Sequence, residues 1–206
     1  MDPQPSSSRP PHRKRIKHRE VLHGTRFLTF SCYERRPLLV RDGPCRMLAR
    51  ALERAVTRHG WLLHAYVFMP EHVHLLVRSM RETCDVADLL KAVKWSTSIS
   101  VKRALEKAGH PLLRELTIRE RPGKLTFRFW QEGPGFDSNV GHDEVGRVIR
   151  YTHLNPVRRE LCADANDWAW SSSRQYYNLD PLTPWAPRVT PWNHMDGGWA
   201  HLRGKV

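Results

Sequence analysis

The stretch W-L-L-H-A-Y-V-F-M-P-E-H-V-H-L-L-V-R, residues 61–78, decides the fold. Residues 61–70 and residues 72–78 are both rich in aromatic and β-branched side chains, so each run predicts a β-strand. Only Glu71 lies between Pro70 and the second run. Two strands with so short a link pair most simply as an antiparallel hairpin.

Helices and further strands are predicted on both sides of this hairpin. Residues 42–59 and residues 83–108 carry apolar side chains at helical spacing, and each run is followed by a glycine. Residues 26–33 (R-F-L-T-F-S-C-Y) and residues 125–131 (L-T-F-R-F-W-Q) predict strands. We expect residues 110–124 to be irregular and residues 132–139 (E-G-P-G-F-D-S-N) to form a glycine-bearing loop.

A third helix is predicted over residues 143–154, and the pair Asn155-Pro156 is expected to break or restart it. The predicted order is β-α-β-β-α-β-α. Its first six elements match the split β-α-β pattern of an α+β, ferredoxin-like fold, in which helices pack on one face of an antiparallel sheet. Because that fold serves many functions, function has to be inferred from the site.

Positive charge dominates the composition. The chain has 206 residues, with 34 Lys and Arg against 21 Asp and Glu, and a formal net charge of +13. Its 40% hydrophobic residues are typical of a globular protein and exclude disorder of the whole chain. So large an excess of positive charge favours a polyanionic partner such as nucleic acid, with solubility as the simpler explanation.

Other classes are disfavoured by what the sequence lacks. The four cysteines, Cys32, Cys45, Cys84 and Cys162, form no C-x-x-C pair, which disfavours zinc knuckles and disulfide frameworks. No apolar window is long enough for a membrane span, and the first twenty residues do not resemble a secretory signal. We therefore expect a cytoplasmic protein that does not contact membranes.

The chain divides into three parts by composition. Residues 1–23 form a polar, then basic, N-terminal arm whose run R-K-R-I-K-H-R includes Lys14 and Arg15, which could lie along phosphates or be solvated. Residues 24–178 hold the predicted elements and form the folded domain. Residues 179–206 form a tail rich in Pro and Trp with little periodicity.

Two sets of side chains could perform chemistry. His72 and His74 lie two residues apart in a predicted strand, so both point to the same face and could share a metal ion, or they could simply face solvent. Tyr151 lies near the end of the third predicted helix. Asn155, four residues later, projects beside Tyr151 if the helix persists, and otherwise caps a short helix that starts at Pro156.

Together, these segments resemble a known family. F-M-P-E-H-V-H-L-L-V, F-W-Q, R-Y-T-H-L-N-P-V-R-R-E-L and W-A-W-S-S, in this order, resemble the tyrosine HUH transposases of the single-strand insertion-sequence type. The likeness is closer to the REP-associated tyrosine transposases and runs from about residue 25 to about residue 173. The chain departs from the family in a longer stretch over residues 109–124, in an extra glycine-rich turn before residue 140, and in its tail.

The resemblance implies a role for each residue. His72 and His74 are expected to bind a divalent metal, Mg or Mn, with Asn155 as the third ligand. Tyr151 is expected to attack a DNA phosphorus, to form a 5′-phosphotyrosine link and to release a 3′-OH. The expected substrate is single-stranded DNA with REP-like hairpins. The acting form is a monomer or homodimer, and a nucleoid-associated location is implied.

Further basic and aromatic residues are candidates for DNA contacts. Arg150, Arg158 and Arg159 flank the tyrosine and could bind phosphates or form a solvated helix end. Trp95, Trp130 and Trp168 could stack on bases, although core packing is favoured for the last two. The main alternative function is a non-catalytic DNA-binding descendant of the same fold. A two-histidine RNA phosphoesterase and a zinc-bound regulator are weaker, since neither has its motif here.

Overall fold

Four strands form one antiparallel sheet in the order β2-β3-β1-β6 in the computed structural model, which describes residues 23–192. The sheet strands are β1 (Thr25–Ser31), β2 (Trp61–Phe68), β3 (His72–Ser79) and β6 (Phe136–Val140); β4 (Thr117–Arg121) and β5 (Lys124–Phe127) pair separately. The helices are α1 (Asp42–His59), α2 (Val86–Lys107), α3 (Leu112–Glu115), α4 (Val145–Arg158) and α5 (Ser173–Tyr176), with short 3-10 turns at Tyr33–Arg35, His142–Glu144 and Ala165–Asp167. This strand order confirms the predicted ferredoxin-like α+β fold.

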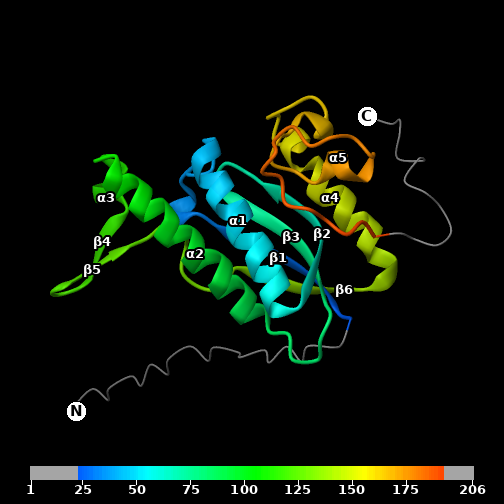
Figure 1. The fold of residues 1–206 in the computed structure, drawn as a ribbon, viewed down its shortest axis with the longest axis horizontal. Helices are drawn as coiled ribbons and strands as arrows, with labels where there is room; N and C mark the ends of the chain where they lie inside the picture. Colours follow the sequence, from blue (N-terminus) through cyan, green and yellow to red (C-terminus); the bar gives the residue numbers. More distant parts are fainter. Residues whose placement is uncertain (1–22, 193–206) are drawn as a thin grey trace, which may run out of the picture.

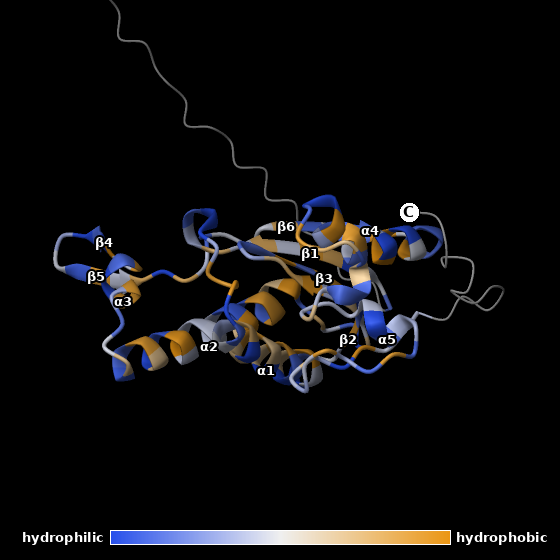
Figure 2. Ribbon diagram, turned by 90° about the horizontal axis from the view of Figure 1, so that it is seen from above, coloured by the Kyte–Doolittle hydropathy of each residue, from blue (hydrophilic) through white to orange (hydrophobic). Residues whose placement is uncertain are grey.

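The sheet separates two layers of helices. Helices α1 and α2 cover one face, as predicted, and α4 lies on the opposite face (Figures 1 and 2). Alternation along β1 sends Leu28 and Phe30 into the main core with α1 and α2. Phe27 points the other way and packs with the smaller cluster that includes Ile149 of α4. The face that carries α4 is therefore the one that can bring helix side chains to the even-numbered residues of β3.

The fourth strand of the sheet lies where the sequence predicted a loop. Residues 136–140 form β6 at the edge of the sheet, whereas the predicted strand over residues 125–131 is extended only in β5, which pairs with β4. The apolar side chains that suggested a strand, Phe129 and Trp130, are buried in the main core outside any strand. Residues 110–124, expected to be irregular, form α3, β4 and the start of β5.

A buried arginine explains why the polar sequence F-D-S-N-V forms a strand. Arg26 of β1 is 1% exposed, and its guanidinium donates to Asp137 Oδ1 at 2.9 Å and to Asn139 Oδ1 at 2.6 Å. Arg26 and Asn139 are also opposite each other in the β1–β6 register. Charge-assisted hydrogen bonds thus take the place of apolar contacts along this edge.

Helix α4 continues through the predicted break. Asn155 and Pro156 are both buried inside α4, and the helix ends at Arg158. A proline ring removes one backbone donor and usually kinks or ends a helix. Here the buried inner face of α4, which also includes Thr152 and His153, holds the continuous helix against the sheet.

The described part of the predicted tail packs on the domain. His64 occupies a bulge of β2, where its Nδ1 lies 2.7 Å from the carbonyl of Thr190. Trp192 is 8% exposed and lies 5.1 Å from the His64 ring. The end of the described chain, at Thr190 and Trp192, therefore packs on β2 around the bulge at His64. Within residues 23–192, every helix is too short or too polar to span a bilayer.

Gly135 is expected to be the least replaceable glycine. Its φ is +84°, and a Cβ there would lie 2.0 Å from the carbonyl oxygen of Thr29 in β1. We expect Gly135→Ala to cost at least about 3 kcal/mol of unfolding free energy, because overpacking adds to left-handed strain. Gly133→Ala is the control, since its φ is +87° but its Cβ would meet nothing within 4 Å. Equal losses for the two variants in urea unfolding would contradict this assignment.

Acid is expected to destabilise the fold at the β2 bulge, because a protonated His64 would be a buried charge. Burial lowers the pKa of His64, although its hydrogen bond to the Thr190 carbonyl opposes the shift. A histidine held neutral in the folded state contributes stability above its unfolded pKa of about 6.5 and loses it as pH falls below that value. We expect His64→Gln to show a shallower loss of stability on acidification than the parent, by up to about 1.4 kcal/mol per pH unit. Identical slopes in chemical unfolding at a series of pH values would refute the prediction.

Candidate active site

Two imidazoles of β3 face each other under α4. His72 and His74 are 6% and 5% exposed, and their Nε2 atoms are 3.0 Å apart. Both lie on the face of the sheet that α4 covers, because β3 side chains alternate. Two ligands at about 2.1 Å from one ion and at right angles to each other are separated by about 3 Å, so this spacing fits a shared divalent cation.

The other ring nitrogens are already engaged. His72 Nδ1 lies 3.1 Å from Glu71 Oε1, and His74 Nδ1 lies 2.7 Å from Thr29 Oγ1. Hydrogen bonds at Nδ1 orient an imidazole and leave Nε2 for a ligand, which is the arrangement typical of metal-binding histidines. The two rings are thus held with their Nε2 atoms next to each other.

Both imidazoles are kept neutral. Burial, with a smaller contribution from the neighbouring His72, lowers the pKa of His74 to about 3. Burial also lowers the pKa of His72, although the Glu71 carboxylate opposes the shift. A neutral ring carries the lone pair that a metal needs, so the pair is ready to bind a cation at neutral pH without first losing protons.

Helix α4 brings an amide to the histidine pair. Asn155 is 7% exposed, and its Nδ2 donates to the carbonyl of Tyr151 at 3.3 Å. The Asn155 side chain is also close enough to His74 for a hydrogen bond that raises the pKa of His74. The donors that meet here are therefore two imidazoles and an amide. Across residues 23–192 no group of three or more His, Cys, Asp or Glu is placed to hold a metal. The Asn155 amide is the candidate for a third donor beside the two imidazoles.

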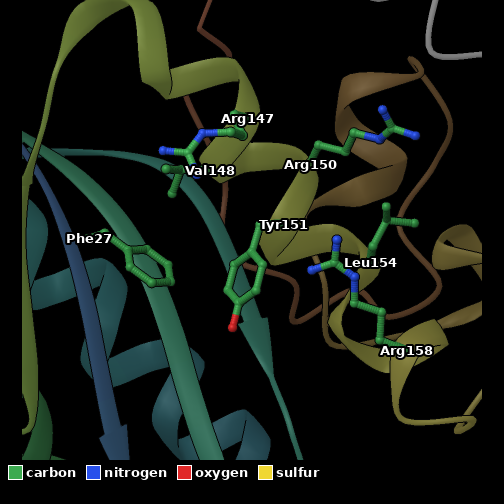
Figure 3. Close-up of a pocket in the computed structure, with 7 residues that line it drawn as sticks. All are labelled: Phe27, Arg147, Val148, Arg150, Tyr151, Leu154 and Arg158. Carbon is green, nitrogen blue, oxygen red and sulfur yellow. The ribbon is translucent and has the colours of Figure 1, made fainter.

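Tyr151 lies beside the same histidines in the same chain. Its ring is 5.7 Å from the His74 ring and 5.9 Å from the Phe27 ring, and the Arg158 guanidinium lies 5.1 Å from its centroid. The side chain is 40% exposed. Figure 3 shows the ring between Phe27 and Arg158, with the hydroxyl pointing away from α4. The phenol is thus held by ring contacts while the residue remains partly exposed.

Arginines surround the cavity next to the tyrosine. Arg147, Arg150 and Arg158 line a cavity of about 640 Å³ together with Phe27 and Tyr151. Arg150 extends away from the tyrosine ring (Figure 3). The cavity next to the tyrosine is thus lined by three arginines, whose guanidinium groups suit phosphate oxygens.

Glu71 connects the histidine strand to the tyrosine helix. One oxygen, Oε1, accepts from Arg159 at 2.9 Å, from His72 at 3.1 Å and from Arg35 at 3.3 Å. Burial raises the pKa of the Glu71 carboxyl, but the Arg159 hydrogen bond and the nearby positive charges outweigh burial and lower it. Arg159, predicted to contact DNA, is therefore already bonded to this carboxylate.

The remaining predicted contact residues lie elsewhere. Trp130 and Trp168 pack with the main core, and their indole N–H groups donate to backbone carbonyls. Trp95 is 67% exposed on α2, across the sheet from α4. Lys14 and Arg15 lie outside the described residues.

Sequence reasoning missed three residues that shape the site. Glu71 was predicted only as a turn residue, although its position directly before His72-Val73-His74 is a signal that it could contact a histidine. Thr29 and Phe27 come from β1, and only the β1–β3 register, in which Thr29 faces His74, reveals them. Contacts made across strands carry no local sequence signal.

A family model matches part of the chain. Residues 25–117 match the model of the family described as "Transposase IS200 like". This range includes both histidines and ends before α4. No curated protein sequence matches the chain significantly.

Two solved structures are similar. The structure of a REP-associated tyrosine transposase bound to a REP hairpin superposes with a TM-score of 0.60 at 17% identity, over 89% of this chain and 96% of that chain. A putative transposase from Deinococcus radiodurans matches with a TM-score of 0.40 at 22% identity, over 66% of this chain and 93% of that one. The family match confirms the predicted resemblance to insertion-sequence transposases over residues 25–117, and the first superposition confirms the fold.

Glu71→Gln tests the hydrogen bond behind His72. The amide keeps the size of the side chain but cannot accept three charged or polar donors as a carboxylate does, so His72 loses its fixed orientation. We expect the affinity for Mn²⁺, measured by calorimetry, to fall about tenfold or more. Glu115→Gln is the matched control, because Glu115, on α3, pairs with Arg36 away from the histidines. Equal Mn²⁺ affinity in both variants would show that Glu71 does not position the ligand.

Proposed function

We propose that the chain, whose residues 25–117 match the IS200-like transposase family model, is a metal-dependent endonuclease and transposase that cleaves and rejoins hairpin-containing single-stranded DNA. The observation that carries the proposal is the meeting of Tyr151 and Asn155 on α4 with His72 and His74 on β3. The first superposed structure holds a REP hairpin, which supports hairpin DNA as the substrate.

His72, His74 and Asn155 would hold the metal, Mg or Mn, through two neutral imidazoles and an amide oxygen. When bound, the ion supplies Lewis acidity that neutralises charge on the scissile phosphate and on the leaving 3′ oxygen. Glu71 and Thr29 keep the two imidazoles oriented through their Nδ1 atoms. The protein's contribution at this point is a rigid, largely buried set of donors.

Tyr151 would act as the nucleophile. Its oxygen attacks the phosphorus, the bond from phosphorus to the 3′ oxygen breaks, and the phenol proton is lost while the released 3′ oxygen gains one. The 5′-phosphotyrosine conserves the phosphoester, so that a second 3′-OH can rejoin the strand without ATP. Arg158 beside the ring and Arg150 at the cavity would bind the backbone phosphates that flank the reacting one.

A single chain would carry out this reaction. The tyrosine, the two histidines and the asparagine all come from one copy, so the proposed chemistry needs no residue from a second copy. We further propose that the protein acts on chromosomal DNA in the bacterial cytoplasm. The basic composition supports attachment to DNA through phosphates.

Tyr151→Phe tests the nucleophile. The substitution removes one exposed oxygen and keeps the ring contacts with Phe27, His74 and Arg158, so stability should change by less than about 0.5 kcal/mol. DNA affinity should persist. Cleavage of a hairpin-bearing single strand with Mn²⁺, and the covalent protein–DNA band on a denaturing gel, should both disappear.

Tyr177→Phe is the matched control and should keep full activity. Mass spectrometry of the adduct from the parent protein should place the DNA on Tyr151. An adduct on another tyrosine, or cleavage by Tyr151→Phe, would overturn the mechanism. DNA binding by the parent protein with no cleavage on any hairpin substrate would favour a non-catalytic DNA-binding protein of the same fold.

A further inference from the structure

The two-stranded sheet of β4 and β5 projects from the body of the protein. We refer to residues 117–127 as the β4–β5 arm. In Figures 1 and 2 the arm lies at the end of the molecule away from α4. Its base is fixed, because the amide of Arg128 donates to the carbonyl of Leu116 at 2.7 Å and Leu116 is fully buried. The arm is therefore a firmly attached extension of the fold.

The outer half of the arm is exposed to solvent. Every residue from 119 to 125 is exposed, and Leu125 has 68% of its surface accessible. The strands are joined by a Pro122-Gly123 turn, with Gly123 at φ +75°. Packing against the described part of the chain therefore does not account for the length of the arm.

The arm and the adjoining end of α2 carry a strong excess of positive charge. Residues 102–128 contain eight Lys and Arg against three Glu. All three glutamates are in ion pairs: Glu106 with Lys102, Glu115 with Arg36, and Glu120 with Lys124 and Arg128. Five basic residues have no ion-pair partner within residues 23–192: Arg103, Lys107, Arg114, Arg119 and Arg121.

We propose that the β4–β5 arm, with the basic end of α2, binds the phosphate backbone of the paired stem of a DNA hairpin. This inference rests on the proposed function, because it assigns a second contact to the same substrate. The arm lies far from Tyr151, so it would contribute to affinity and to the choice of substrate rather than to the chemical step.

The composition of the arm favours a duplex over a single strand. Proteins that bind single strands offer aromatic side chains on which bases stack, and residues 119–125 contain none. A two-stranded ribbon also has the width that the major groove of a duplex admits. A duplex presents about one phosphate charge per 1.7 Å of its axis, which suits a row of unpaired arginines.

The test compares two probes on the full chain. Fluorescence anisotropy would measure binding of a labelled DNA hairpin with a fully paired stem and of labelled oligo-dT of the same length, over a series of salt concentrations. The variant is Arg119→Ala/Arg121→Ala. Arg58→Ala/Lys91→Ala is the control, since it removes the same charge from exposed positions of α1 and α2.

We expect the arm variant to bind the hairpin at least about fivefold more weakly and to lower the slope of log affinity against log salt by about 2, as for two lost phosphate contacts. Oligo-dT binding should equal that of the parent protein. Arg119→Lys/Arg121→Lys should retain the parent slope. Unchanged hairpin affinity, an equal loss in the control, or an equal loss for oligo-dT would overturn the proposal.

The adduct assay separates this inference from the proposed function. At saturating hairpin DNA the arm variant should still form the Tyr151 adduct, because its catalytic residues are intact. If the parent forms the adduct and the arm variant binds the hairpin as tightly as the parent does, the arm assignment fails alone. If the arm variant loses hairpin affinity while no protein forms an adduct, the proposed chemistry fails and the arm assignment stands.

Discussion

The carboxylate of Glu71 is the point at which the two halves of the candidate site meet. Its Oε1 accepts from His72 on β3 and from Arg159 at the end of α4. The carboxylate therefore orients the His72 imidazole and bonds to the end of the helix that carries the tyrosine and the asparagine. Glu71 is only about 10% exposed, so removal of its charge would take away the acceptor that both Arg159 and Arg35 share. The lowered pKa of Glu71 keeps that acceptor ionised at neutral pH.

Most of the fold could be predicted because its elements have strong local patterns. The helix over residues 42–59 has the same bounds in the structure, and the hairpin over residues 61–78 becomes β2 and β3 with small changes at the ends. Apolar alternation in strands and apolar stripes in helices report burial directly. These elements also carry the main core.

The predictions of secondary structure that were wrong fall where burial and the local sequence pattern disagree. Residues 136–140 are mostly polar, and they form a strand because a distant residue, Arg26, binds Asp137 and Asn139. Phe129 and Trp130 are apolar because they fill the core from a non-strand segment. Pro156 predicts a helix end, yet α4 continues because its inner face is packed. In each case a contact between distant residues outweighs the local preference.

The candidate site was likewise predictable only in part from local sequence. The shared face of His72 and His74 follows from strand alternation, and their spacing of two residues was enough to predict it. The direction of their Nδ1 atoms depends on Thr29 and Glu71, and the proximity of Tyr151 to His74 depends on how α4 crosses the sheet. Such relations are properties of the assembled fold. The resemblance to a family could indicate the residues, whereas only the structure relates them to one another.

The continuity of α4 through Pro156 has a mechanical consequence. Tyr151 and Asn155 lie one turn apart on a single helix with no hinge between them, so their separation cannot change while the helix is intact. Any displacement of α4 would carry the proposed nucleophile and the proposed third ligand together, and would leave the two imidazoles behind on β3. Attack and metal coordination would then be gained or lost in a single rigid-body movement.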